Sequence, residues 1–320
     1  MPVSQNPRKS RPIAPRFSIA EWYGIPLESY SPEERRNLAE RQYISKNQRA
    51  PIVCPFSAPA NCWKDSGVCT LRMYSQSESG AVTADDTLRT TCPTRFQEDG
   101  TIFRWVGETV LACDHPLVIG QVAFLDPPDS WDESRSEREV GRIDNVLLVP
   151  DSAPLSWCAL ELQSVYFQGE AMRNEFAVLR HHQGNDLPFP AKSHRPDYRS
   201  SGPKRLMPQL QTKVPSLRRW GKKMAVLVDR SFFAAMGKMR PVKHISNSDV
   251  VWFIVRYEQT AAGRFRLVPD DVYLTTLEDS VEGLTAGIPA SLEIFEQRIL
   301  DKLQRSTRPS KIAADQQLID

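Results

Sequence analysis

Long apolar runs are missing from this sequence, since no stretch approaches the roughly 20 residues that a helix needs to cross a bilayer. The N-terminal residues, MPVSQNPRKSRPIAPR, also lack the apolar core of a secretory signal. Apolar side chains still make up 40% of the 320 residues, enough to bury a full core, and the mean hydropathy is -0.43. We therefore expect a cytoplasmic protein with no membrane partner, folded as one large domain or two small ones.

A strong net charge is missing as well, because 41 Lys and Arg residues face 39 Asp and Glu residues. Total charge therefore does not identify a nucleic-acid-binding protein, but the distribution of charge is informative. Between Lys192 and Lys223 the chain has ten basic residues and one acid, Asp197, whereas acids gather at 126–139 and 270–282. This segregation favours a basic, DNA-facing surface within residues 185–245, with a solvated basic loop as the alternative.

Cysteine is scarce, and the six cysteines are not expected to form disulfides in the cytoplasm. Four of them crowd into a polar segment of 39 residues: Cys54, Cys62, Cys69 and Cys92. Four thiolates make a closed tetrahedral site for Zn²⁺ or a single iron ion, and metal binding would stabilise a segment that is poor in core residues. The spacings match no ordinary zinc finger, so the sequence leaves the metal open. Cys113 and Cys158 have apolar neighbours and are expected to be buried thiols.

Three regions follow one another along the chain in this interpretation. Residues 1–50 form an N-terminal arm, disordered up to residue 16, and two helices that begin at the capping boxes Ser18 with Glu21 and Ser31 with Glu34. Residues 51–100 form the metal-binding subdomain with the four cysteines. Residues 101–320 form a mixed α/β (α+β) core that includes the basic segment 185–245.

Apolar periodicity predicts the elements of that core. Strands are expected at 121–125, 142–149, 157–163, 224–228 and 250–257. Helices are expected at 101–113 and 171–180, and an amphipathic helix from Ser291 should carry Leu292, Phe295, Ile299 and Leu303 on one side. The Pro-rich stretch 185–220 predicts a long loop with a short helix near 206–210.

Two acids interrupt strands that are otherwise apolar, Asp144 in RIDNVLLV and Glu161 in WCALELQSV. A carboxylate between buried neighbours is costly unless it is paired, and two such strands side by side would form a Mg²⁺ site at one end of a sheet. The spacing Asp-x₁₆-Glu-x-Gln has the form of the nuclease signature PD-(D/E)xK, with Ile143 in place of Pro and Gln163 in place of Lys. By itself this spacing is weak, because half-buried strands often carry an edge acid.

The two carboxylates and their neighbours suggest a division of roles. We expect Asp144, Glu161 and the Leu162 carbonyl to hold Mg²⁺, which lowers the pKa of its bound water. Gln163 points to the same strand face as Glu161 and would orient that water. Its amide carries no positive charge and is no base at neutral pH, so the proton leaves to solvent or to a substrate phosphate.

A third acid is usual in sites of this kind and could hold a second metal ion. Glu108 lies on the helix before the first strand and is the better-placed candidate. Glu139 stands only five residues before Asp144, about 17 Å along an extended chain, and is interpreted as a turn residue.

Four stretches carry a family resemblance, in the order CPF…NCWKDSGVC…CP, GRIDNVLLV, WCALELQSVYFQG and RLMPQLQTKVPSLRRWGKK. Together they cover most of residues 50–260, and the chain resembles the NotI family of type II restriction endonucleases. The resemblance implies a homodimer that cuts a palindromic, GC-rich DNA site with Mg²⁺, and a mononuclear iron held by the four cysteines. It also accounts for Gln163, since these enzymes resemble one another in replacing the usual lysine. A cognate DNA methyltransferase would be the genetic partner.

Base recognition is expected to fall to arginines of the basic segment, because a guanidinium group bridges O6 and N7 of guanine. Arg205, Arg218 and Arg219 are candidates for this role, whereas Lys222 and Lys223 suit phosphates better. Two rival functions remain at this point. One is a non-catalytic DNA-binding protein built around a Cys₄ metal, and the other is a nuclease with the same core that acts in repair or on mobile elements.

Overall fold

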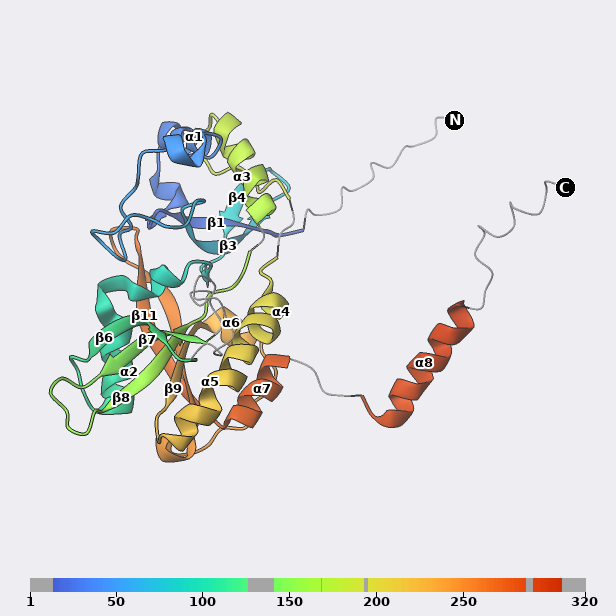
Figure 1. Ribbon diagram of the computed structural model, residues 1–320. Coiled ribbons are helices and arrows are strands. Elements are labelled where there is room, and N and C mark those ends of the chain that lie inside the picture. Colours follow the sequence, from blue (N-terminus) through green and yellow to red (C-terminus); the bar gives the residue numbers. More distant parts are fainter. Residues whose placement is uncertain (1–13, 126–140, 168, 193–194, 286–289, 307–320) are drawn as a thin grey trace, which may run out of the picture. The chain divides into compact units, whose positions relative to one another are not determined.

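The computed structural model describes residues 14–125, 141–167, 169–192, 195–285 and 290–306 (Figure 1). Most of the arm that was predicted to be disordered lies outside these residues. The chain divides into two compact units, Met1–Thr285 and Ala286–Asp320. No helix among the described residues is long and apolar enough to span a membrane.

The larger of two sheets in the first unit has six strands in the order β11-β10-β9-β8-β7-β6. Their bounds are β6 Leu117–Ala123, β7 Arg142–Leu148, β8 Trp157–Leu162, β9 Met224–Asp229, β10 Val250–Gln259 and β11 Phe265–Thr275. Strands β6, β7 and β8 form an antiparallel meander, β8, β9 and β10 are parallel, and β11 is antiparallel to β10. The five predicted strands are confirmed, with β6 beginning and ending earlier than expected, and β11 was not predicted.

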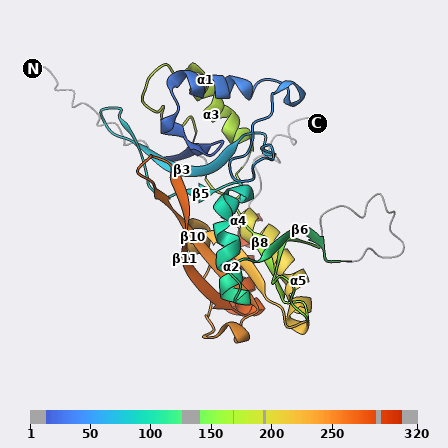
Figure 2. The same ribbon diagram turned by 90° about the vertical axis from the view of Figure 1, so that its left-hand side faces the viewer.

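Helices cover both faces of this sheet. Helix α2 (Thr101–Leu111), which was predicted, packs its Ile102 and Val106 on one face and stands in front of the sheet in Figure 2. Helix α5 (Met207–Arg219) packs on the opposite face. Strand β8 alternates between them: Cys158, Leu160 and Leu162 belong to the α2 side, and Ala159 belongs to the α5 side. Glu161, two residues after Ala159, therefore faces α5.

Helix α5 corrects the prediction of a long loop over 185–220. The segment holds α4 (Tyr198–Ser201), a π-helical turn (Gly202–Leu206) and then the 13 residues of α5. Pro208 suggested a loop, but it stands in the first helical turn, where a missing N–H costs little. Pro215 lies inside the helix and is tolerated because Leu210, Val214 and Leu217 bury themselves against the sheet.

The smaller sheet has the order β2-β1-β3-β4, with β5 also paired to β3. Its strands are β1 Arg16–Trp22, β2 Ile25–Pro26, β3 Val68–Gln76, β4 Val82–Ala84 and β5 Arg89–Thr90. Helices α1 (Pro32–Arg41) and α3 (Gly169–His181) lie side by side above it (Figure 1). Strand β1 belongs to the first 50 residues and its partner β3 to the cysteine-rich region, so these two regions share one sheet.

The helix predicted at Ser18–Glu21 is wrong, because both residues lie in β1. Their side chains serve distant partners instead of a cap: Ser18 donates to Glu175, and Glu21 accepts from Arg95. Long-range pairing with β3 thus overrides the local capping signal. The second capping box is confirmed, since Ser31 and Glu34 cap α1 reciprocally.

The remaining helices complete the two units. In the first unit these are α6 (Arg230–Ala234) and α7 (Leu277–Thr285). The second unit contains α8 (Leu292–Ser306), which confirms the predicted amphipathic helix. The four apolar residues expected on one side of α8 are all exposed: Leu292, Phe295, Ile299 and Leu303.

Candidate active site

Asp144 and Glu161 face each other across two neighbouring strands. The antiparallel register pairs Asn145 with Leu160 and Val146 with Ala159, so the next pair along is Asp144 with Glu161. The backbone N–H of Asp144 donates to Glu161 Oε1 at 3.5 Å, and the N–H of Leu162 donates to Asp144 Oδ2 at 3.3 Å. The structure thus brings the two predicted carboxylates together at the carboxyl end of β8.

Glu161 is the more deeply buried of the two carboxylates. Its side chain is 2% exposed, whereas Asp144 is half-buried. Desolvation, and then the neighbouring negative charge of Asp144, raise the pKa of Glu161 to about 7, against the opposing effect of Lys213. A buried carboxylate beside another is an arrangement that a divalent cation would relieve.

Lys213 of α5 is a member of this site that sequence reasoning missed. Its Nζ lies 2.6 Å from Glu161 Oε1 and 2.6 Å from Gln209 Oε1, and its side chain is 1% exposed. A signal existed in the sequence, because Lys213 continues the spacing of Leu206, Leu210 and Leu217 along a helix. Helical spacing is informative only in a helix, and this segment was predicted to be a loop.

Gln163 and Leu162 end the strand that carries Glu161. The Gln163 amide donates from Nε2 to the carbonyl of Ser164 at 2.6 Å, and its backbone N–H donates to the carbonyl of Leu227. The Gln163 side chain is half-buried. In this conformation the amide group is engaged with its own backbone.

Glu108 lies apart from these residues. It is exposed on α2, and α2 packs on the sheet face opposite to the one that carries Glu161. Within the described ranges, Glu108 forms no hydrogen bond with Asp144 or Glu161. The other candidate for the third acid, Glu139, lies outside the described residues.

The four cysteines of the predicted metal site line one small cavity together with Lys64 and Trp63. They are free thiols. Burial raises the pKa of Cys62 and Cys69. Among the residues that the structure describes, no three His, Cys, Asp or Glu side chains meet as a metal-binding group. The four thiols therefore line one cavity, but their arrangement is not that of a formed metal site.

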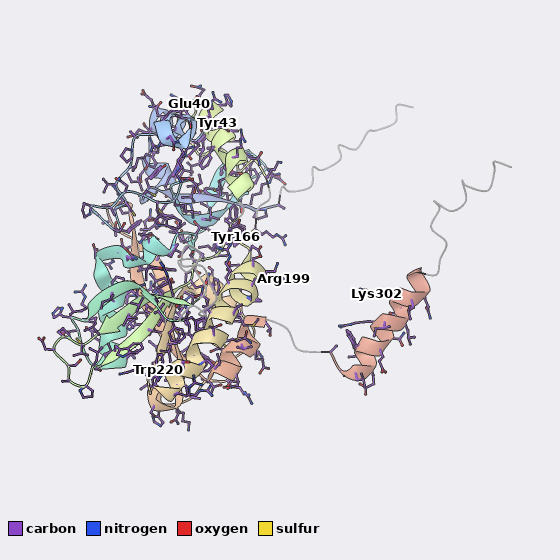
Figure 3. All side chains as sticks on the ribbon, viewed as in Figure 1. Glu40, Tyr43, Tyr166, Arg199, Trp220 and Lys302 are labelled. Atoms are coloured by element: carbon purple, nitrogen blue, oxygen red, sulfur yellow. The ribbon has the colours of Figure 1, made fainter. Side chains whose placement is uncertain are left out.

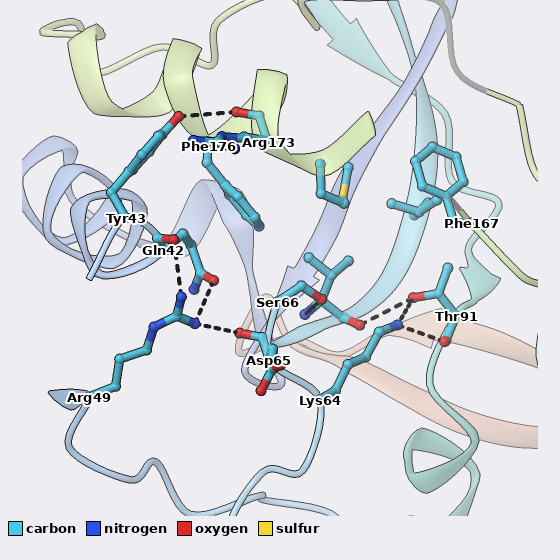
Figure 4. Close-up of a pocket in the computed structure, with 13 residues that line it drawn as sticks. Gln42, Tyr43, Arg49, Lys64, Asp65, Ser66, Thr91, Phe167, Arg173 and Phe176 are labelled. Carbon is cyan, nitrogen blue, oxygen red and sulfur yellow. Dashed lines mark hydrogen bonds between the residues drawn. The ribbon is translucent and has the colours of Figure 1, made fainter. Parts of the chain in front are cut away.

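Lys64 lines this cavity and also a larger one of about 460 Å³ (Figure 4). Its ammonium donates to the carbonyl and hydroxyl oxygens of Thr91, as the figure shows. Burial lowers the pKa of Lys64, and the nearby Cys92, Cys69 and Cys62 oppose that effect. A half-buried cation beside three of the cysteines would offset the negative charge of thiolates.

The predicted DNA-binding residues occupy two places in the fold. Arg218, Arg219, Lys222 and Lys223 flank Trp220 at the C-terminal end of α5. Trp220 contacts Trp157 at the start of β8, the end away from Glu161. Arg205 instead stacks over the Tyr166 ring, 4.2 Å from its centroid, just beyond Gln163. Figure 3 shows Tyr166 and Trp220 at opposite ends of the large sheet.

Several of these basic groups already have partners within the chain. Arg218 donates to Asp249 at 2.9 and 2.5 Å and to Glu278 at 3.1 Å. Lys222 donates to the Leu155 carbonyl, and Lys223 to the carbonyls of Ser246 and Ser248. The basic stretch is thus largely part of the packed fold and not a free loop.

Comparison with known proteins adds one match. The family model described as Restriction endonuclease NotI matches residues 38–267, which is most of the chain. No curated protein matches the sequence. The matched range includes both carboxylates, Lys213 and all four clustered cysteines.

Proposed function

The chain belongs to the NotI restriction endonuclease family, and from this premise we propose that it makes Mg²⁺-dependent double-strand cuts at a specific DNA site. The family identifies a nuclease that acts on DNA. The observation that carries the rest is the pairing of Asp144 with Glu161 at the end of β8. Oxygen ligands from two strands suit Mg²⁺, which retains several waters and accepts phosphate oxygens.

The surrounding topology supports a PD-(D/E)xK core. A helix, α2, precedes an antiparallel meander of β6, β7 and β8, and α5 then crosses over to β9, which lies parallel beside β8. In this proposal the metal ligands are Asp144, near the start of β7, and Glu161, near the end of β8, which lie at the same edge of the sheet because the two strands are antiparallel.

The chain's own residues would prepare the reaction as follows. Asp144 and Glu161 would hold the ion with the Leu162 carbonyl, and the two acids fit this role because each carboxyl group accepts a hydrogen bond from the other strand at the same end of β8. When bound, Mg²⁺ supplies an activated water and stabilises charge on the phosphate. Gln163 would orient the water once its amide turns away from Ser164. The proton leaves to solvent or to a phosphate of the substrate.

The four cysteines are proposed to hold a structural iron or zinc ion. The donor set fits, since four thiols line one cavity and the half-buried Lys64 lies beside three of them. On binding, the thiols would lose their protons and move together, so metal binding would add to the stability of the N-terminal sheet. Whether the ion is iron or zinc does not change this role.

Double-strand cutting at a palindromic site requires two active sites, which is why we include a homodimer in the proposal. The site is proposed to be GC-rich, read by arginines, and protected in the host by a cognate methyltransferase. The enzyme would act in the cytoplasm, where such DNA is encountered.

The test is cleavage of phage and plasmid DNA by the purified protein with and without Mg²⁺, followed by sequencing of the ends. We expect discrete fragments with a shared terminal sequence, only when Mg²⁺ is present. A smear without a common end sequence would favour a repair-type nuclease. Sequence-specific binding without cleavage would contradict the proposal and favour a DNA-binding protein.

A further inference from the structure

A buried ammonium group contacts one of the two candidate carboxylates. Lys213 and Glu161 are 1% and 2% exposed, and their charged atoms are 2.6 Å apart. Lysine is almost never fully buried unless it is paired, and a buried ion pair is not in general more stabilising than apolar packing. A helix that needed only stability would carry a leucine at this position, between Leu210 and Leu217.

The ammonium group is held by two acceptors from different elements. Glu161 Oε1 on β8 and Gln209 Oε1, one helical turn earlier on α5, each accept from Nζ at 2.6 Å. An ammonium group has three N–H bonds, and among the described residues Lys213 uses two of them for these two acceptors. The charge is therefore fixed in place before any substrate arrives.

Position 163 cannot supply this charge. Gln163 is neutral, and its amide donates to the Ser164 carbonyl. Within the part of the chain that the structure describes, the cation that contacts the acids is Lys213, which comes from a helix 50 residues further along the sequence than Gln163.

We propose that Lys213 supplies the positive charge of the catalytic site, as a positioning residue whose buried ammonium group holds the Glu161 carboxyl group in place next to Asp144. This inference rests on the proposed nuclease function. A neutral amide at position 163 provides no positive charge, whereas Lys213 places one next to Glu161. Such a charge is most effective when it is held in place in a buried site, as Lys213 is.

The first experiment compares Lys213→Met with Gln211→Met, an exposed control on the same helix. Single-turnover cleavage is measured at saturating Mg²⁺ and DNA, and DNA affinity is measured in Ca²⁺. We expect Lys213→Met to lose about 100-fold or more in rate with unchanged affinity, Lys213→Arg to be less impaired, and the control to match the wild type.

The second experiment moves the charge back to the strand. The double variant Lys213→Met with Gln163→Lys places a cation two residues from Glu161 on β8. We expect it to cleave at least about tenfold faster than the single variant, or faster than Asp144→Asn where the single variant is unfolded.

Thermal midpoints establish which variants are folded. A folded Lys213→Met protein with near wild-type rate would overturn the inference, as would a folded double variant no faster than Asp144→Asn. A wild-type protein that does not cleave DNA contradicts the proposed function instead, so the two failures are distinguishable.

Discussion

The side chain of Asp144 is hydrogen-bonded to the backbone of Leu162, with 3.3 Å between the Leu162 nitrogen and Asp144 Oδ2. The residue therefore does two things at once: it presents a carboxylate, and it links β7 to β8 where the regular ladder has ended. Truncation to alanine would remove both, so an isosteric substitution is the cleaner probe of the site.

Asp144→Asn is expected to abolish cleavage while keeping the fold. The amide oxygen still accepts from Leu162, but a neutral ligand holds Mg²⁺ poorly, and we expect a rate loss of about 100-fold or more. Affinity for DNA in Ca²⁺ and the thermal midpoint should change little. Asp151→Asn, an exposed acid in the turn after β7, is the matched control. Cleavage by Asp144→Asn at more than a tenth of the normal rate would remove Asp144 from the site.

The buried pair Arg95–Glu21 should be important for stability. Nε and Oε2 are 2.9 Å apart, and the side chains are 0% and 1% exposed. Arg95 also donates to the Phe265 carbonyl of the large sheet. Arg95→Met leaves a buried carboxylate without its partner, and should lower the free energy of unfolding by about 3–5 kcal/mol in urea titrations.

An exposed pair provides the comparison for that measurement. Lys46 and Asp65 lie 2.9 Å apart with side chains 71% and 59% exposed, so Lys46→Met should cost less than about 1 kcal/mol. Equal losses in the two variants would show that Arg95 does not hold the sheets together.

Metal content tests the cysteine cluster. The wild-type protein should carry about one iron or zinc ion per chain by elemental analysis, released slowly by EDTA, because four ligands must separate. Cys62→Ser should lower both the metal content and the thermal midpoint. Cys113→Ser, a cysteine outside the cluster, should keep both. If wild-type protein stripped of metal by EDTA kept the thermal midpoint of the untreated protein, the structural ion would be ruled out.

Arg205 and Arg218 should differ in their effect on DNA binding. Arg205 stacks on Tyr166, five residues after Glu161, and forms no ion pair with the acids that the structure describes. Arg205→Ala should therefore weaken binding to specific and random DNA alike and lower the salt slope by about one unit. The Arg218 guanidinium is already matched by Asp249 and Glu278, so Arg218→Ala should leave affinity nearly unchanged.

Fluorescence anisotropy in Ca²⁺ at several salt concentrations measures both variants. If Arg218→Ala instead lost about 1–3 kcal/mol on the specific site only, Arg218 would be a base-reading residue, as the sequence first suggested.

Local sequence was sufficient for the strands at the centre of the large sheet. Strands β9 and β10 are buried on both faces, so they appear as continuous apolar runs, and β7 and β8 carry single acids that stand out against such runs. For the same reason Asp144 and Glu161 could be selected as a pair before any contact between them was known.

Tertiary structure decided what the local signals could not. Ser18 and Glu21 form a strand because β3 offers them the distant partners Arg72 and Thr70. Residues 207–219 form a helix around Pro215 because the sheet buries its apolar stripe. Lys213 became part of the site only through that packing. The sequence determines which residues prefer burial and for which acids burial is costly. The partner that compensates each buried charge, such as Lys213 for Glu161, depends on contacts between distant segments.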